Sequence, residues 1–150
     1  MRVMDVPEFQ DARDLAAVNE GLTVRDAAIL MAGRNVGAVI VLRDGCMSGI
    51  FTERDLMTKV AAQGLDCGTT LVRDVMTPRV VTVSPEMELN ACLRTMTEGG
   101  FRHLPVVDSD GEPMGMISQR DFVALTFGQA VRRMRGRARY GLRKLFRAGA

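Results

Sequence analysis

The chain contains nearly the same seven residues twice, as GIFTERD at 49–55 and as GMISQRD at 115–121. Each copy has a glycine, two apolar residues, a small hydroxyl side chain, two polar residues with arginine second, and an aspartate. The hydroxyl and carboxylate side chains are Thr52 and Asp55 in the first copy, and Ser118 and Asp121 in the second. Two explanations fit this spacing: both copies mark the same kind of helix start, or they form two copies of one binding site.

The repetition extends well beyond these seven residues. From Val24 the first unit reads VRDAAILMAGRNVGAVIVLRDGCMSGIFTERDLMTKV, and from Leu89 the second reads LNACLRTMTEGGFRHLPVVDSDGEPMGMISQRDFVAL. The two segments align over their whole length, with one extra residue in the turn of the second. An internal repeat of this size indicates two copies of one supersecondary unit.

Each unit begins with a predicted amphipathic helix. Apolar residues recur at i, i+3, i+4 and i+7 from the first residue of each unit, which is the spacing of one helix face. Thr23 and Asp26 predict a capping box at the first helix start. Ser84 followed by Pro85 predicts an N-cap and a proline in the first turn of the second helix.

A β-hairpin is predicted after each helix. Apolar runs rich in β-branched residues lie at 38–42 and 104–107, and an Asp-Gly turn and a second short strand follow each run. The repeated seven residues then close the hairpin and open another helix. The stretch VVTV at 80–83 is expected to be the opening strand of the second unit, with 16–22 as its counterpart in the first.

The repeated motif has a structural and a functional explanation. A hydroxyl followed three residues later by an acid caps a helix N-terminus. The same geometry suits a nucleotide, because a helix N-terminus attracts phosphate and an acid can accept both ribose hydroxyls. A cap alone does not explain Gly49 and Gly115 in the same register, although a bend in a strand would. The residues themselves leave both explanations open.

Composition favours one class of protein and argues against others. The chain is 47% apolar and 25% charged, as in ordinary globular proteins. The three cysteines form no CxxC pair and His103 is the only histidine, so we expect no metal site, no catalytic residues and no enzyme activity. The first 14 residues lack the apolar core of a signal peptide, which predicts a cytoplasmic protein.

The C-terminal segment is strongly basic. Residues 132–150 hold eight Arg or Lys and no acid, which leaves 12 basic against 18 acidic groups in the rest of the chain. Apolar residues at helical spacing from Val131 predict a basic amphipathic helix over 128–150. Such a helix could pack on the acidic body or on a second subunit, bind nucleic acid, or lie on an anionic membrane surface.

These elements, in their order, spacing and duplication, resemble a tandem pair of CBS domains, also called a Bateman module. The resemblance includes the segment VRDVMTPRVVTVSP between the units and FRHLPVVD in the second unit. The resemblance implies an α+β fold of two β-α-β-β-α repeats about a pseudo-twofold axis, often in a homodimer. The corresponding division is an N-terminal arm (1–14), a first unit (15–66), a second unit (67–127, with linker and opening strand at 67–83) and the basic tail (128–150).

The resemblance also implies clefts that bind an adenosine compound such as AMP, ADP, ATP or S-adenosylmethionine, with no further cofactor. By similarity, Asp55 and Asp121 would bind the ribose hydroxyls, while Thr52 and Ser118 would lie near phosphate. The residues expected around the adenine are those near Met76, Thr77 and Val80, together with Met116 and Ile117.

Arg102 and His103 distinguish the two units. They fall where the γ subunit of AMP-activated protein kinase, a member of the family, has basic phosphate contacts, whereas the first unit has Gly37 and Ala38 there. The resemblance therefore implies unequal phosphate affinity in the two clefts. Arg102 could instead be a solvated surface arginine and His103 a structural histidine.

Two functions are compatible with these features. One is a regulatory module that binds an adenine nucleotide and passes its occupancy to a regulated protein, through differential affinity for two states. The other is an interaction or scaffold protein whose arginine-rich tail binds nucleic acid, an anionic membrane or a protein partner. The aspartate present in both motifs favours the first.

Overall fold

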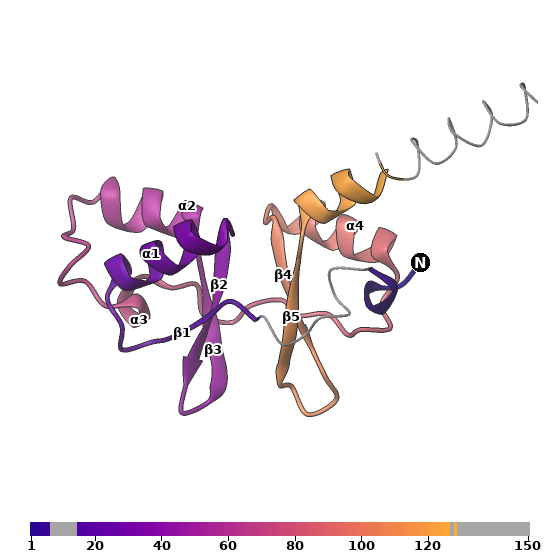
Figure 1. The fold of residues 1–150 in the computed structure, drawn as a ribbon, viewed down its shortest axis with the longest axis horizontal. Coiled ribbons are helices and arrows are strands. Elements are labelled where there is room, and N and C mark those ends of the chain that lie inside the picture. Colours follow the sequence, from indigo (N-terminus) through magenta and orange to yellow (C-terminus); the bar gives the residue numbers. More distant parts are fainter. Residues whose placement is uncertain (7–14, 127, 129–150) are drawn as a thin grey trace, which may run out of the picture. The chain divides into compact units, whose positions relative to one another are not determined.

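The computed structural model describes residues 1–6, 15–126 and 128 of the chain (Figure 1). The chain divides into two compact units, Met1–Ile117 and Ser118–Ala150. The elements of the first repeat are β1 (Ala17–Asn19), α1 (Val24–Arg34), β2 (Ala38–Arg43), β3 (Cys46–Thr52), α2 (Glu53–Asp55), the π-helix η4 (Leu56–Ala61) and α3 (Val72–Val75). Those of the second repeat are α4 (Leu89–Gly99), β4 (His103–Val107), β5 (Pro113–Ser118) and a helical segment at 119–126.

The first repeat is built on a three-stranded sheet in the order β1-β2-β3, in which β1 runs parallel to β2 and β2 antiparallel to β3. The predicted hairpin and opening strand of this repeat are confirmed. Arg43 pairs with Cys46 across a two-residue turn, and both turn residues, Asp44 and Gly45, have positive φ (50° and 83°). This is the backbone that Asp-Gly favours in a hairpin turn.

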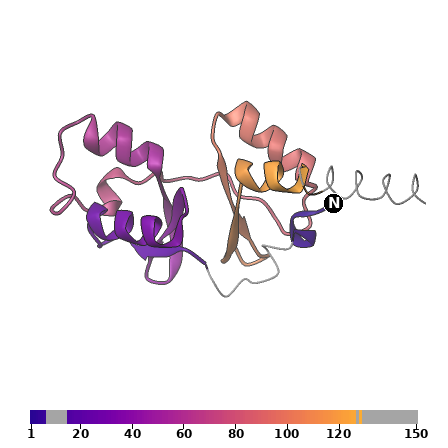
Figure 2. The same ribbon diagram turned by 45° about the horizontal axis from the view of Figure 1, so that its top comes forward.

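The core of the first repeat lies between this sheet and the helices that cover one of its faces. Helices α1 and η4 lie on the same side of the sheet in both views (Figures 1 and 2). Phe51 of β3, Val39 of β2 and Val60 of η4 are completely buried. The apolar face predicted for α1 is also confirmed, because Val24, Ala27 and Met31 belong to this core.

The second repeat has a shorter sheet than the sequence predicts. Strands β4 and β5 form a two-stranded sheet, but 80–83 is no strand, and only Val83 pairs, through a parallel bridge to Val106. Its amide donates to the carbonyl of Pro105 (3.0 Å), and its carbonyl accepts from Val107 (2.9 Å). Proline has no N–H to donate, so Pro105 limits how far the ladder can extend.

The two predicted helix caps have different outcomes. Thr23 and Asp26 form the expected capping box at the start of α1. The prediction of an N-cap at Ser84 is wrong, because α4 begins at Leu89 and Glu88 precedes it. The carbonyl of Ser84 instead accepts a hydrogen bond from the amide of Met87 (3.1 Å), so these residues form a turn before the helix.

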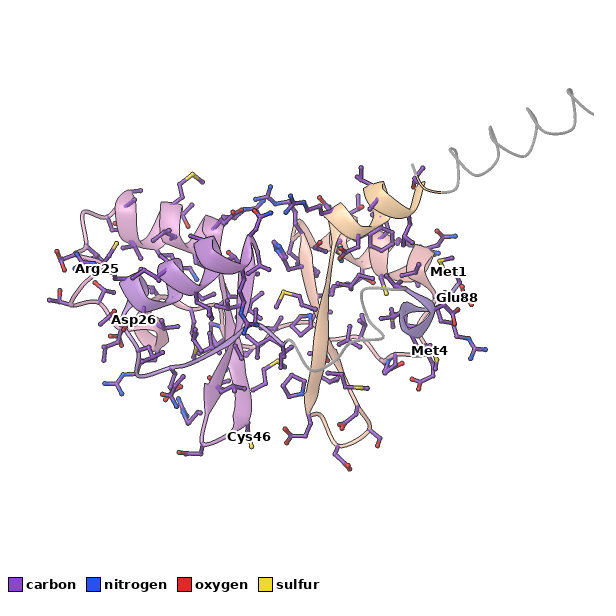
Figure 3. All side chains as sticks on the ribbon, viewed as in Figure 1. Met1, Met4, Arg25, Asp26, Cys46 and Glu88 are labelled. Carbon is purple, nitrogen blue, oxygen red and sulfur yellow. The ribbon has the colours of Figure 1, made fainter. Side chains whose placement is uncertain are left out.

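The first six residues bond to the start of α4 and to the turn before it. The amide of Leu89, at the start of α4, donates to the carbonyl of Met1 (3.1 Å), and a short 3₁₀ helix, η1 (Val3–Asp5), follows. The amide of Val3 donates to the carbonyl of Met87 (3.0 Å), and the Val3 side chain is fully buried. Met1, Met4 and Glu88 accordingly lie together in Figure 3. The described part of the predicted arm is therefore an ordered component of this region.

Some sequence-based expectations fall outside the described residues. The basic helix predicted at 128–150 is one of them, since only Gly128 of that range is described. Among the helices that are described, none is long and apolar enough to cross a membrane.

Candidate functional site

The first seven-residue motif places its hydroxyl and carboxylate at a helix start. Thr52 is the last residue of β3, and the amide of Asp55 donates to its Oγ1 (3.1 Å). In return, the amide and the hydroxyl of Thr52 donate to Oδ2 of Asp55 (2.9 and 3.0 Å). This is a capping box, as predicted from the spacing, and it fixes the Asp55 side chain against the end of the strand.

The second carboxylate oxygen of Asp55 is also occupied. Its Oδ1 accepts a hydrogen bond from the Thr77 hydroxyl (2.9 Å) and lies 2.8 Å from Nζ of Lys59. Asp55 is the one charged residue that is buried among those the structure describes, with 5% of its surface exposed. A buried carboxylate needs such partners, because an unpaired charge is costly to remove from water.

Lys59 joins three parts of this site. Besides Asp55, its ammonium donates to the carbonyl of Met76 (3.2 Å) and to Oγ1 of Thr77 (3.2 Å). The residue lies in the π-helix η4, whose wide turn is visible in the hydrogen bond from the Ala62 amide to the Met57 carbonyl, five residues back. Lys59 is not among the residues predicted from the sequence, although its position four residues after Asp55 is the spacing of a helical ion pair.

The glycine that opens the motif has a packing reason in the first copy. A Cβ on Gly49 would lie 2.5 Å from the carbonyl oxygen of Thr77, which is closer than side-chain atoms approach backbone. The next residue, Ile50, exchanges two backbone hydrogen bonds with Thr77 (3.0 and 2.8 Å). Gly49 therefore lets the 76–77 segment pair against β3, a contact that neither a strand bend nor a ligand explains.

A pocket of about 130 Å³ opens beside this motif. Five of the residues that the sequence analysis named line it: Thr52, Asp55, Thr77, Arg102 and His103. Its other lining residues are Gly37, Ile50, Glu53, Arg54 and Phe101. The side chains from 101–103 in the second repeat thus line the same pocket as the motif of the first repeat.

Backbone and side-chain contacts hold the cationic edge of the pocket. Nη1 of Arg54 donates to the carbonyl of Gly100 (2.8 Å), just after α4 ends. Gly37 makes room for two neighbours, because a Cβ there would lie 3.1 Å from a carboxylate oxygen of Glu53 and 3.3 Å from Nε2 of His103. Arg54, Arg102 and His103 thus gather basic groups next to the acidic Glu53 and Asp55.

The remaining predicted residues do not line this pocket. Met76 packs against the core of the first repeat, and Ile117 is buried. Val80 and Met116 are likewise absent from the lining. Ser118 and Asp121 belong to the second compact unit, in which the amide and hydroxyl of Ser118 donate to Oδ2 of Asp121 (2.6 and 2.9 Å).

Comparison with known proteins identifies the repeats. The CBS domain family matches residues 6–62 and again residues 72–128. The chain belongs to the CBS-domain family. The resemblance and the predicted α+β class with two CBS repeats are thereby confirmed. The axis relating the two repeats, and the unit boundaries at 15, 67 and 128, stay predictions.

Relatives and solved structures agree with this assignment. An uncharacterized protein of Methanopyrus kandleri is 33% identical over 124 residues, covering 82% of this chain and 63% of its own length. The mitochondrial CBS domain-containing protein CBSX3 of Arabidopsis thaliana is 39% identical over 67% of this chain, which spans 51% of that protein. The solved structure of a protein with CBS domains from Burkholderia ambifaria has a TM-score of 0.77 and is 35% identical to this chain. The match covers 84% of this chain and 91% of that one.

Two more distant solved structures share the fold and contain adenosine compounds. A CBS domain protein from Pyrobaculum aerophilum, 23% identical with a TM-score of 0.71, is complexed with AMP; 81% of this chain and 89% of that one are covered. A CBS domain pair that is 20% identical, with a TM-score of 0.75, is in complex with 5-methylthioadenosine and S-adenosyl-L-methionine. That match covers 86% of this chain and 98% of the other. At these identities the likeness establishes the fold alone.

Proposed function

We propose that this chain is a regulatory module that binds an adenosine compound, such as AMP, ADP, ATP or S-adenosylmethionine, beside its repeated motifs. The observation that carries the proposal is the pocket next to Thr52 and Asp55, which is lined by a capped helix start that includes Arg54 and by Arg102 and His103. Hydroxyl and carboxylate groups suit a ribose, and basic side chains suit a phosphate. The adenosine compounds in the two distant CBS structures support the same ligand class.

The small volume of the pocket indicates that ligand binding requires a change of conformation, which a regulated protein can detect. Its volume of about 130 Å³ lies below the ~300–1,000 Å³ of typical small-molecule sites, so a whole nucleotide requires it to widen. A ligand that binds the widened arrangement better than the narrow one shifts the chain toward it. We propose that a regulated protein senses this shift, and that the chain acts as a homodimer.

The ligand class can be tested by isothermal titration of the full chain with adenosine, AMP, ATP and S-adenosylmethionine. If Arg102 contacts phosphate, Arg102→Ala should weaken AMP binding roughly tenfold or more, the usual effect of losing a charge-assisted hydrogen bond, and change adenosine binding little. Arg94→Ala, which removes an exposed arginine from α4, is the matched control and should change neither.

Two results would count against this proposal. Absence of binding by all four compounds would contradict the ligand class. An equal loss of AMP and adenosine affinity in Arg102→Ala would contradict the phosphate role of Arg102, because adenosine has no phosphate. The homodimer can be tested separately, by light scattering on the protein with and without AMP.

A further inference from the structure

The carboxylate of Asp55 has no acceptor position left for a ribose. Oδ2 accepts from the amide and the hydroxyl of Thr52, while Oδ1 accepts from the Thr77 hydroxyl and pairs with Lys59. A carboxylate offers about four lone-pair positions, and these four contacts use them. A ribose hydroxyl can therefore bind Asp55 only if it displaces one of these partners.

Lys59 is the partner best placed to leave. Its side chain is 41% exposed, compared with 7% for Asp55, so its ammonium can return to water. Thr52 is held by the capping box, and Thr77 is held by its backbone hydrogen bonds to Ile50. In the arrangement described, the three N–H donors of Lys59 match the three acceptors of Asp55, Met76 and Thr77.

The second motif has no equivalent of this lysine. The residue four positions after Asp121 is Leu125, whose side chain has no donor. The hydrogen bonds described for Asp121 come from Ser118, and both reach Oδ2. Within the part of the chain that the structure describes, the two motifs thus differ in whether a lysine four residues after the aspartate pairs with its remaining oxygen.

We propose that Lys59 is a specificity-determining residue that occupies the ribose position of the first motif, so that this motif binds adenosine compounds more weakly than the second. The inference rests on the proposed function. It adds that the two motifs differ in affinity for adenosine compounds, and that the residue four positions after each aspartate causes this difference. Lys59 acts as an internal competitor of the ligand, because it pairs with the carboxylate of Asp55, which lines the pocket.

The test isolates the first motif and uses a ligand without phosphate. In an Asp121→Asn background, titration with adenosine reports on the binding that remains at Asp55. Adding Lys59→Leu, which copies the residue of the second repeat, should raise adenosine affinity about tenfold or more, the effect of removing a competing charge-assisted contact. Adding Arg94→Leu instead removes one exposed positive charge elsewhere and should leave the affinity unchanged.

Unchanged, weaker or undetectable adenosine binding after Lys59→Leu would overturn this inference if the wild-type chain binds adenosine. Equal affinity at the two motifs of the wild type would overturn it as well, and the proposed function would stand in both cases. Absence of binding by every variant and by the wild type would overturn both. Thermal unfolding checks that each variant is folded, and Lys59→Met, which keeps most of the unbranched stem, replaces the leucine variant if that one is not.

Discussion

The two copies of the seven-residue motif differ most in the surroundings of their aspartates. Asp55 is buried and bonded through both oxygens, to Thr52, Thr77 and Lys59. Asp121 is partly exposed, and Ser118 donates both of its described hydrogen bonds to one oxygen. A short motif therefore specifies the helix cap in both places, while residues outside it determine what else the carboxylate can bind.

We expect the largest effect from removing the aspartates themselves. The comparison predicts that losing Asp55 lowers the free energy of unfolding more than losing Asp121. Asp55→Ala removes the acceptor of Lys59, Thr77 and the Thr52 amide at a buried position, and we expect a loss of about 2–4 kcal/mol in the free energy of unfolding. Asp121→Ala removes a helix cap and should cost about 1 kcal/mol. Urea denaturation of both variants measures the difference, and similar losses would contradict the comparison.

The glycine of the first motif gives the next largest effect. Gly49→Ala places a methyl group against the carbonyl of Thr77, and overpacking of this kind typically costs about 1–3 kcal/mol. Gly33→Ala is the matched control, because nothing lies within 4 Å of a Cβ there and the residue is inside helix α1. That change should stabilise the protein by up to about 1 kcal/mol. Thermal unfolding of the two variants should shift in opposite directions.

Placing a lysine at the equivalent position of the second motif tests the same difference in ligand affinity in the opposite direction. Leu125→Lys places an ammonium four residues after Asp121, as in the first repeat. If this spacing is what weakens ligand binding, adenosine affinity at the second motif should fall roughly tenfold, or about 1.4 kcal/mol. Titration in an Asp55→Asn background measures this site alone. An unchanged affinity there would show that the surroundings of Lys59, rather than its spacing, are decisive.

We expect the smallest effect at the capping box of Thr23 and Asp26 at the start of α1. This box is not part of the proposed ligand site, so it serves as a control for a cap that is only structural. The hydrogen bonds that the Thr23 hydroxyl and amide donate to the Asp26 carboxylate lower the pKa of Asp26. Because the folded pKa is below the unfolded value, the stabilisation is present above that value, near 3.8, and is lost as the pH falls through the folded pKa. Thr23→Ala should therefore flatten the pH dependence of unfolding below about pH 4, and leave its shape near neutrality unchanged.

The repeats, the first hairpin and two of the caps could be predicted from the sequence because they depend on local patterns. Asp44-Gly45 and the Thr23 and Thr52 boxes each lie within a few residues. The predicted Ser84 cap is wrong because residues 84–87 form a turn and the helix begins only at Leu89, where the carbonyl of Met1, far away in the sequence, accepts from the Leu89 amide.

The candidate site was predictable in part for the same reason. The spacing of the motif indicates Thr52 and Asp55, and the family resemblance indicates Arg102 and His103. All four line the pocket, and their ligand contacts stay predictions. Lys59 was missed because its role depends on where Met76 and Thr77 pass β3, and the reason for Gly49 depends on the same long-range pairing. The contacts of Lys59 with Met76 and Thr77, and of Gly49 with Thr77, leave no local pattern in the sequence, although the spacing of Lys59 from Asp55 does.

The docking of the first residues beside α4 has a consequence for the order of folding. Val3 and Val6 are buried, and the Val3 amide is bonded to a carbonyl 84 residues further along the chain. Contacts of such sequence separation form late, because the entropy of closing a long loop must be overcome first. On a ribosome, these residues leave the exit tunnel long before their partners at 85–89. Residues 3–6 are therefore synthesised well before their partners but are among the last to reach their final positions.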